Sequence, residues 1–266
     1  MTDFSDVSLS FQKHVAVVEI NRPPNNFFDL SLIEQIADAL EQIDKDSNCR
    51  SIVLASKGKA FCAGANFGTG QLDGSGSKDF TETGFQNTTG KLYTEAARLF
   101  YNRKPIIGAI QGPAIGGGLG LALVSDFRIG STSSRFSANF VKLGLHQGFG
   151  ISSTLPRLIG IQAANSMLLT GRRLNGHEAL KIGLIDQLVA DGEVRNAAHK
   201  LAHEIAENAP LAVMSVRATM RKDIAETVKK ITEHELKEQQ WLRSTSDSYE
   251  GIVAVAERRT GVFKGA

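Results

Sequence analysis

The sequence predicts an α/β fold in which strands and helices alternate in a core and a mostly helical region follows. Three observations support this. Short β-branched runs alternate with helical apolar patterns up to Ile129. Strand patterns then become rare, and residues 193–263 carry chiefly helical periodicity. The chain has 266 residues, enough for one large domain with an appended helical unit.

The strands are predicted from runs rich in valine and isoleucine that are bounded by loop residues. The first, VAVVEI, ends at a loop formed by Asn21, Arg22 and two prolines. The predicted strands cover residues 15–20, 51–55, 106–110, 126–129 and 184–189.

The helices are predicted from apolar residues at helical spacing. In the first helix, Ser31 and Glu34 have the spacing of a capping box. Its apolar face is formed by Leu32, Ile33, Ile36, Leu40 and Ile43. Further helices are predicted over 91–101 and 116–124, and a glycine- and serine-rich loop, which we expect to be mobile, over 68–90.

Composition excludes several classes of protein. The net charge of +2 is too small to indicate nucleic-acid binding or attachment to a membrane surface. No apolar run reaches the roughly 18 residues of a membrane span. The N-terminal residues lack the pattern of a signal peptide, and two cysteines, Cys49 and Cys62, are too few for a disulfide framework. A cytoplasmic location is therefore expected, and no cluster has metal-ligand spacing.

Two segments rich in small residues are the best candidates for a site. The first, KAFCAGAN, spans residues 59–66 and follows the second strand. The second, Gly116-Gly117-Gly118, lies where a strand passes into a helix. Glycine lets the backbone approach a ligand closely, and a helix N-terminus offers unpaired N–H groups. Such groups suit an anion or a developing oxyanion. The glycines complete neither a dinucleotide-binding fingerprint nor a Walker A loop.

The order and spacing of these segments resemble the crotonase superfamily, which includes enoyl-CoA hydratases and isomerases. The similarity extends through INRP at 20–23, AFCAGAN at 60–66, IQGPAIGGG at 110–118 and LPRLIG at 155–160, and reaches Phe263 and Lys264. It implies a crotonase-like ββα spiral core in residues 1–195 and a C-terminal helical trimerisation region in residues 196–266. It also implies a homotrimer or a dimer of trimers, with an acyl-CoA as substrate and no separate cofactor.

The resemblance also implies roles for individual residues. Ala65 and Gly117 match the two backbone amides that stabilise a thioester oxyanion in the family. Three further residues of the first segment, together with a loop arginine and a C-terminal pair, match positions that lie near CoA. These are Arg22, Ala63, Gly64, Asn66, Phe263 and Lys264.

The chain departs from the family at its two acid–base positions. Gly120 and Phe140 occupy the places where hydratases carry catalytic glutamates, and neither can transfer a proton. Ordinary enoyl-CoA hydration is therefore not expected. His146 is the candidate that replaces them, because an imidazole can act as acid or base. Asp73 and Glu82, in the predicted loop, are weaker candidates.

Three interpretations remain open at this stage. The chain is a CoA-thioester enzyme with non-standard acid–base groups, an acyl-CoA-binding protein without turnover, or an unrelated α/β protein whose glycines serve packing. The intact segments around Ala65 and Gly117 favour chemistry, whereas the replaced glutamates favour binding alone.

Overall fold

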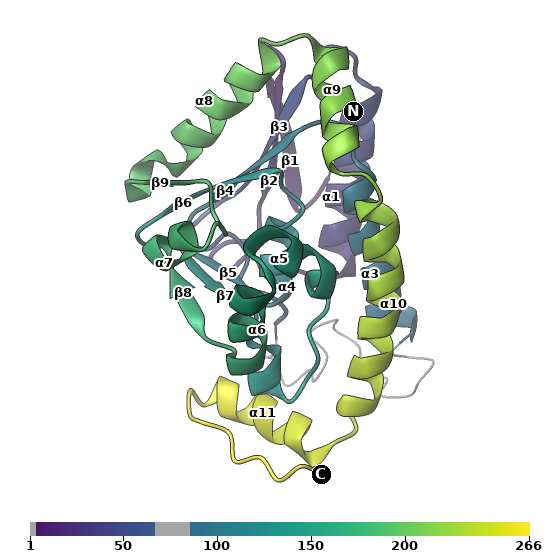
Figure 1. Cartoon of the computed structure of the whole chain (residues 1–266), viewed down its shortest axis with the longest axis vertical. Coiled ribbons are helices and arrows are strands. Elements are labelled where there is room, and N and C mark those ends of the chain that lie inside the picture. Colours follow the sequence, from purple (N-terminus) through teal and green to yellow (C-terminus); the bar gives the residue numbers. More distant parts are fainter. Residues whose placement is uncertain (1–3, 67–85) are drawn as a thin grey trace.

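The computed structural model describes residues 4–66 and 86–266. The candidates Asp73 and Glu82, and most of the predicted loop, lie outside the described residues. The molecule is elongated in Figure 1, with helices α8 and α9 at one end of its long axis and helix α11 at the other.

A six-stranded sheet forms the centre of the fold, in the order β1-β2-β3-β4-β6-β9. The first two strands are antiparallel and the remaining neighbours are parallel. The strands are β1 (Val7–Gln12), β2 (Val15–Ile20), β3 (Ser51–Ser56), β4 (Ile106–Ile110), β6 (Phe127–Ser131) and β9 (Gln187–Val189). A smaller sheet joins β5 (Pro113–Ile115), β7 (Arg135–Ser137) and β8 (Arg173–Asn175), in that order.

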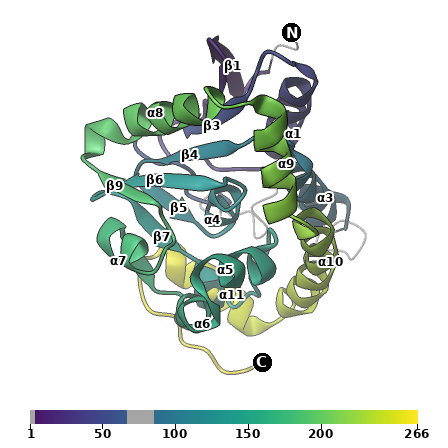
Figure 2. The ribbon, with the colours of Figure 1, turned by 45° about the horizontal axis from the view of Figure 1, so that its top comes forward.

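Helices surround the sheets, as Figures 1 and 2 show. They are α1 (Leu30–Lys45), α3 (Lys91–Arg98), α4 (Gly117–Ala122), α5 (Ile151–Ile159), α6 (Ile161–Thr170), α7 (Gly176–Lys181), α8 (Val194–Ala206), α9 (Pro210–Met220), α10 (Ile224–Leu242) and α11 (Ser246–Ala256). Short helical turns cover Gln86–Gly90, Leu99–Tyr101, Asn139–Leu143 and Asp191–Glu193. The predicted boundary between residues 195 and 196 falls inside α8.

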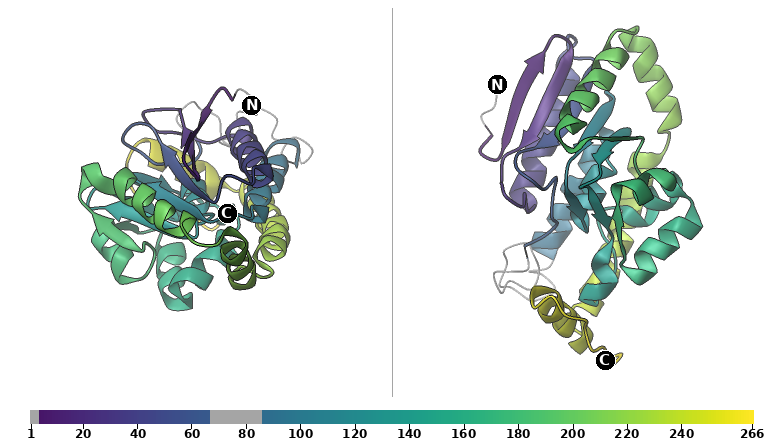
Figure 3. Two further views of the ribbon diagram at one scale, coloured as in Figure 1. Left: turned by 90° about the horizontal axis from the view of Figure 1, so that it is seen from above. Right: turned by 90° about the vertical axis from the view of Figure 1, so that its left-hand side faces the viewer.

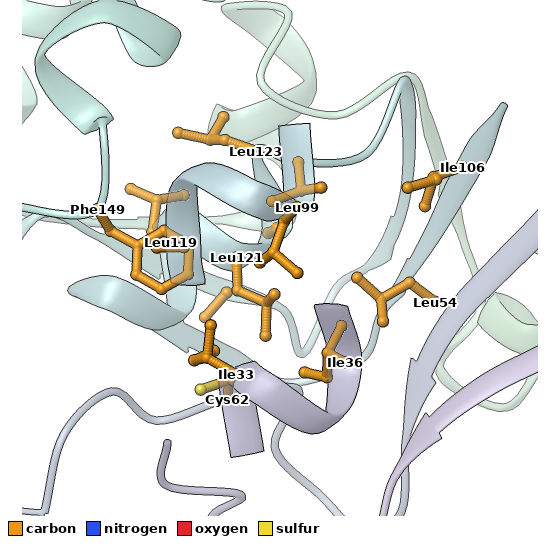
Figure 4. Packing of buried hydrophobic residues seen from close by; sticks show 14 of the residues in the cluster. Ile33, Ile36, Leu54, Cys62, Leu99, Ile106, Leu119, Leu121, Leu123 and Phe149 are labelled. Carbon is orange, nitrogen blue, oxygen red and sulfur yellow. The ribbon is translucent and has the colours of Figure 1, made fainter. Parts of the chain in front are cut away.

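Two apolar clusters lie on opposite faces of the six-stranded sheet. The larger packs α1, α3 and α4 against residues such as Leu54 and Ile106. Figure 4 shows side chains of α1 and α4 in this cluster, such as Ile36 and Leu121. The smaller places Val53, Ile107 and Ile129 against α8. The views in Figure 3 show α8 lying across this face. Strands buried on both faces read as continuous apolar runs, which is why their positions were predictable.

Several sequence predictions are confirmed and others need correction. The strands expected at 15–20 and 106–110 have those bounds. The capping box expected at Ser31 and Glu34 is wrong, because the N-cap is Asp29, two residues before Ser31, and its carboxylate accepts from the Leu32 N–H at 2.9 Å. Strands β1, β5, β7 and β8 were not predicted, and three of these have only three residues.

Asp126 joins the sheet to the C-terminal helices. Its carboxylate accepts from the Ile106 N–H at 2.8 Å, from Arg217 Nε at 2.7 Å and from an Arg221 N–H at 3.0 Å. All three side chains of this ion-paired group are at least 86% buried. Asp126 thus has a structural role.

Candidate active site

Backbone hydrogen bonds join the two segments that sequence analysis singled out. The Cys62 N–H donates to the Pro113 carbonyl at 3.0 Å, and the Ile115 N–H donates to the Cys62 carbonyl at 3.1 Å. Cys62 and Ala114 form a parallel bridge. Ala65 and Gly117 each lie three residues beyond this pair, so the two backbone segments run side by side toward the same place.

Glycine is required where the segments touch. A Cβ added at Gly118 would lie 2.1 Å from the Cys62 carbonyl oxygen, and one at Gly64 would lie 2.8 Å from the Ile115 oxygen. Gly64 also has a φ of 93°, a conformation that L side chains rarely adopt. The small residues therefore serve close approach of the two backbones.

A buried asparagine, Asn26, holds the backbone of the first segment, residues 59–66, by hydrogen bonds. The Asn26 side chain is fully buried, and its Nδ2 donates to the carbonyls of Lys57 and Ala60, both at 2.7 Å. The Ala63 N–H donates to the Asn25 carbonyl at 2.9 Å. These bonds hold the loop before Ala65 in one conformation.

The amides of Ala65 and Gly117 remain available to a ligand. Gly117 is the first residue of α4, so its N–H precedes the hydrogen-bonded turns of the helix. In residues 4–66 and 86–266, neither the Ala65 N–H nor the Gly117 N–H donates a backbone hydrogen bond outside the helices and strands. Both residues line a single cavity of about 410 Å³, a size typical of small-molecule sites.

The cavity wall is largely apolar, with a few polar groups. Phe28, Leu92, Phe140, Leu143 and Phe149 form much of it. The ring of Phe28 packs against Gly117, where an added Cβ would lie 2.3 Å from its Cζ. Phe28 also meets Phe149 edge-to-face, with ring centroids 5.8 Å apart. Val255 and Ala256 of α11 reach the same cavity, so the C-terminal region contributes to the site.

Aromatic side chains lie at or beside the two positions, 120 and 140, where sequence analysis noted the departure from the family. A Cβ at Gly120 would lie 2.7 Å from both Cβ and Cδ1 of Phe149. The Phe149 side chain therefore fills the space beside Gly120. Phe140 lines the cavity itself. Neither position offers a carboxylate.

His146 stands behind the cavity wall. It is not among the lining residues, whereas its neighbour Leu145 is. Its Nδ1 lies 2.7 Å from the Gln147 carbonyl oxygen, and its ring contacts that of His234 edge-to-face.

The residues expected to contact CoA fall into two groups. Ala63, Gly64 and Asn66 line the cavity, whereas Arg22, Phe263 and Lys264 do not. Arg22 forms ion pairs with Asp6 and Asp29, both at 2.7 Å. The Phe263 side chain is exposed, and the backbone N–H of Lys264 donates to Asp247.

Three polar residues of the site were missed by sequence reasoning. Tyr93 of α3 and Gln239 of α10 line the cavity and are hydrogen-bonded to each other. Behind them, Glu235 is fully buried and accepts from the N–H groups of Gly150 and Ser152 at 2.7 and 2.9 Å. Its carboxylate thus caps the N-terminus of α5. Burial raises the pKa of Glu235 to about 7. Glu235 lies seven residues after Val228, on the apolar face of an amphipathic helix, and this spacing was the signal available in the sequence.

Cys62, in the first segment, is fully buried. Burial raises the pKa of the Cys62 thiol to about 12, so it stays protonated. Within the described ranges, no group of three or more metal-ligating side chains is present.

The helices of the described residues include none with the length and apolar character of a membrane span.

Comparisons with known proteins point to one family. Residues 10–266 match the enoyl-CoA hydratase/isomerase family model. The chain is 33% identical to (E)-benzylidenesuccinyl-CoA hydratase of Thauera aromatica, covering 98% of this chain and 99% of that protein. It is 32% identical to carnitinyl-CoA dehydratase of Proteus mirabilis, covering 97% and 98%.

A solved structure shows the same fold. The crystal structure of an enoyl-CoA hydratase/isomerase from Pseudoalteromonas atlantica superposes with a TM-score of 0.84 at 28% identity, covering 98% of this chain and all of that one. Together with the family match, this shows that the chain belongs to the enoyl-CoA hydratase/isomerase family of the crotonase superfamily.

Proposed function

We propose that the chain processes an acyl-CoA thioester and stabilises an enolate-like oxyanion with the amides of Ala65 and Gly117. The observation that carries the proposal is the pairing of Cys62 with Ala114, which brings both amides to one cavity. A thioester oxygen becomes negatively charged when the α-carbon loses a proton or the β-carbon is attacked. Each amide donor lowers such a barrier by about 3 kcal/mol in comparable oxyanion holes.

We propose further that addition of water by two carboxylates is not the reaction. Relatives named as a hydratase and a dehydratase are about one-third identical to this chain. Their names do not transfer directly, because Gly120 and Phe140 supply no carboxylate and Phe149 fills the space beside Gly120. Without those groups, general acid–base catalysis of hydration loses roughly 10²–10⁴-fold at each step.

The oxyanion site is tested by the infrared carbonyl stretch of bound butyryl-CoA labelled with ¹³C at the thioester carbon. Two amide donors polarise the carbonyl, so its stretch is expected at lower frequency in the complex than in water. S-butyl-CoA, a thioether that lacks the oxygen, controls for binding by the rest of the molecule. An unshifted carbonyl in a saturated complex would rule out the oxyanion site.

CoA contacts and assembly complete the proposal. Ala63, Gly64 and Asn66 are proposed to lie along the CoA moiety, which is supported by their place in the cavity wall. Arg22, Phe263 and Lys264 are also proposed as CoA contacts, and the C-terminal pair would reach the CoA of a neighbouring subunit.

A homotrimer, or a dimer of such trimers, is proposed as the assembly. Support comes from α9, where no side chain is buried although several are apolar. Leu211, Val216 and Met220 are each at least 64% exposed. Light scattering after size-exclusion chromatography measures the subunit number.

The acid–base role of His146 stays a proposal. Only its position next to Leu145 supports it, and loss of turnover in His146→Ala with unchanged acyl-CoA affinity is the outcome that would assign it. The alternative function, acyl-CoA binding without turnover, is favoured by the absence of carboxylates at positions 120 and 140. Tight binding of a panel of acyl-CoA compounds, with no turnover of any, would establish that alternative.

A further inference from the structure

A tyrosine hydroxyl is held in the cavity wall by a relay of hydrogen bonds. The Tyr93 side chain is 6% exposed and lines the cavity. Its hydroxyl donates to Gln239 Oε1 at 2.9 Å, and Gln239 Nε2 donates to the His146 carbonyl at 2.7 Å. Because the second bond requires the amide nitrogen, it fixes the amide oxygen as the atom that faces the hydroxyl. The relay sets the direction of the Tyr93 O–H.

A glycine opposite the hydroxyl makes room for it. A Cβ at Gly148 would lie 1.7 Å from Tyr93 Oη and 2.9 Å from Gln239 Nε2. Gly148 also lines the cavity, and the next residue is Phe149, which contacts Phe28 beside Gly117. One continuous wall therefore connects the hydroxyl with the amide of Gly117.

The other ionisable side chains lining the described part of the cavity are Asp29, Arg173 and Arg243. Asp29 caps α1 and is ion-paired with Arg22. The two arginines remain charged at any physiological pH and do not exchange protons with a substrate. Tyr93 is the neutral titratable group of this wall in the part of the chain that the structure describes.

We propose that Tyr93 transfers the proton between the acyl α-carbon and the protein, and that Gln239 positions it. This inference rests on the proposed function. In the protonation direction, the electron pair of the enolate forms a Cα–H bond, the Tyr93 O–H bond breaks, and the thioester carbonyl is restored. The phenolate then takes a proton from water. In the reverse direction, the phenolate removes the α-proton and the electron pair moves into the enolate held by the two amides.

The surroundings of Tyr93 favour its protonated form. Burial, and then the charge of Glu235, raise its pKa, while the charge of Arg243 lowers it by less. Tyr93 is thus a phenol at neutral pH and acts as an acid toward an enolate, which is far more basic. Removal of an α-proton by the phenolate becomes faster as the pH rises.

The test is uptake of deuterium at the α-carbon of butyryl-CoA in D₂O, followed by mass spectrometry. Tyr93→Phe keeps the ring and removes the hydroxyl, and we expect exchange to fall by roughly 10²–10⁴-fold with the dissociation constant of butyryl-CoA changed less than about threefold. Tyr101→Phe is the matched control. Tyr101 follows the same helix, is 47% exposed, and its hydroxyl donates to Glu226, so exchange is expected to stay at the wild-type rate.

The outcomes separate this inference from the proposed function. A shifted carbonyl stretch with equal exchange in wild type and Tyr93→Phe would overturn the role of Tyr93 and leave the oxyanion site intact. A shifted carbonyl with no exchange in the wild type at any pH would also overturn it. If the carbonyl is unshifted, the oxyanion site fails, and the role of Tyr93 fails with it.

Positioning by Gln239 has a separate measurement. Gln239→Leu removes the acceptor that orients the Tyr93 hydroxyl, so deuterium exchange at fixed pH should fall while the dissociation constant of butyryl-CoA changes by less than about threefold. Gln240→Leu, on the next position of α10, controls for a general effect on the helix. Equal exchange in wild type and in a folded Gln239→Leu protein would contradict the positioning role.

Discussion

Replacing Glu235 by glutamine tests the electrostatics behind the cavity wall. The carboxylate is fully buried, and burial raises its pKa from 4.5 to about 7 even though three hydrogen bonds oppose the shift. At about 1.4 kcal/mol per pH unit, that displacement corresponds to about 3 kcal/mol of folding free energy.

The sign follows from proton binding. Between pH 4.5 and about 7, the folded protein holds a proton on Glu235 that the unfolded chain has lost. The free energy of unfolding must therefore fall as the pH rises through this window, and the contribution is constant above it. Glu235→Gln removes this dependence. The stability of wild type relative to the variant should thus decrease by about 3 kcal/mol from acid to neutral pH.

Urea unfolding followed by circular dichroism, at fixed protein concentration and at several pH values, measures this difference. Glu233→Gln is the matched control, because Glu233 lies on the same helix but is exposed. Its stability should follow that of the wild type at every pH. A wild-type-to-Glu235→Gln difference that is the same at low and neutral pH would refute the reasoning.

Three further changes probe other parts of the molecule. Asp126→Asn leaves the buried guanidinium groups of Arg217 and Arg221 without their counter-charge. The free energy of unfolding, measured in urea, should fall by about 3–5 kcal/mol. A fall below about 1 kcal/mol, as for an exposed ion pair, would contradict this. Gly120→Ala presses a methyl group against Phe149 and should cost about 1–3 kcal/mol in urea unfolding. An unchanged unfolding midpoint would count against the close contact. Leu211→Glu places a charge on the exposed face of α9 and should convert the proposed trimer to monomers in light scattering, whereas an unchanged mass would exclude this face as the contact.

The limits of sequence prediction are seen in particular elements. Strands β2, β3 and β4 were predictable because they are buried on both faces and read as apolar runs. Strands β5, β7 and β8 have three residues each and carry no periodicity. The start of α1 was misplaced because Ser31 and Glu34 have the spacing of a capping box. In the structure the N-cap is Asp29, whose carboxylate accepts the backbone N–H of Leu32.

By itself the sequence determined the family, the two segments of small residues and the absence of a carboxylate at Gly120 and Phe140, because these features are local in the chain. Only the tertiary structure decided which polar groups lie in and behind the cavity wall. The Tyr93–Gln239 pair and Glu235 join α3, α10 and the start of α5, elements separated by up to 146 positions in the chain. Neither the direction of a side chain nor its desolvation is encoded in local spacing, since both arise when distant helices pack together.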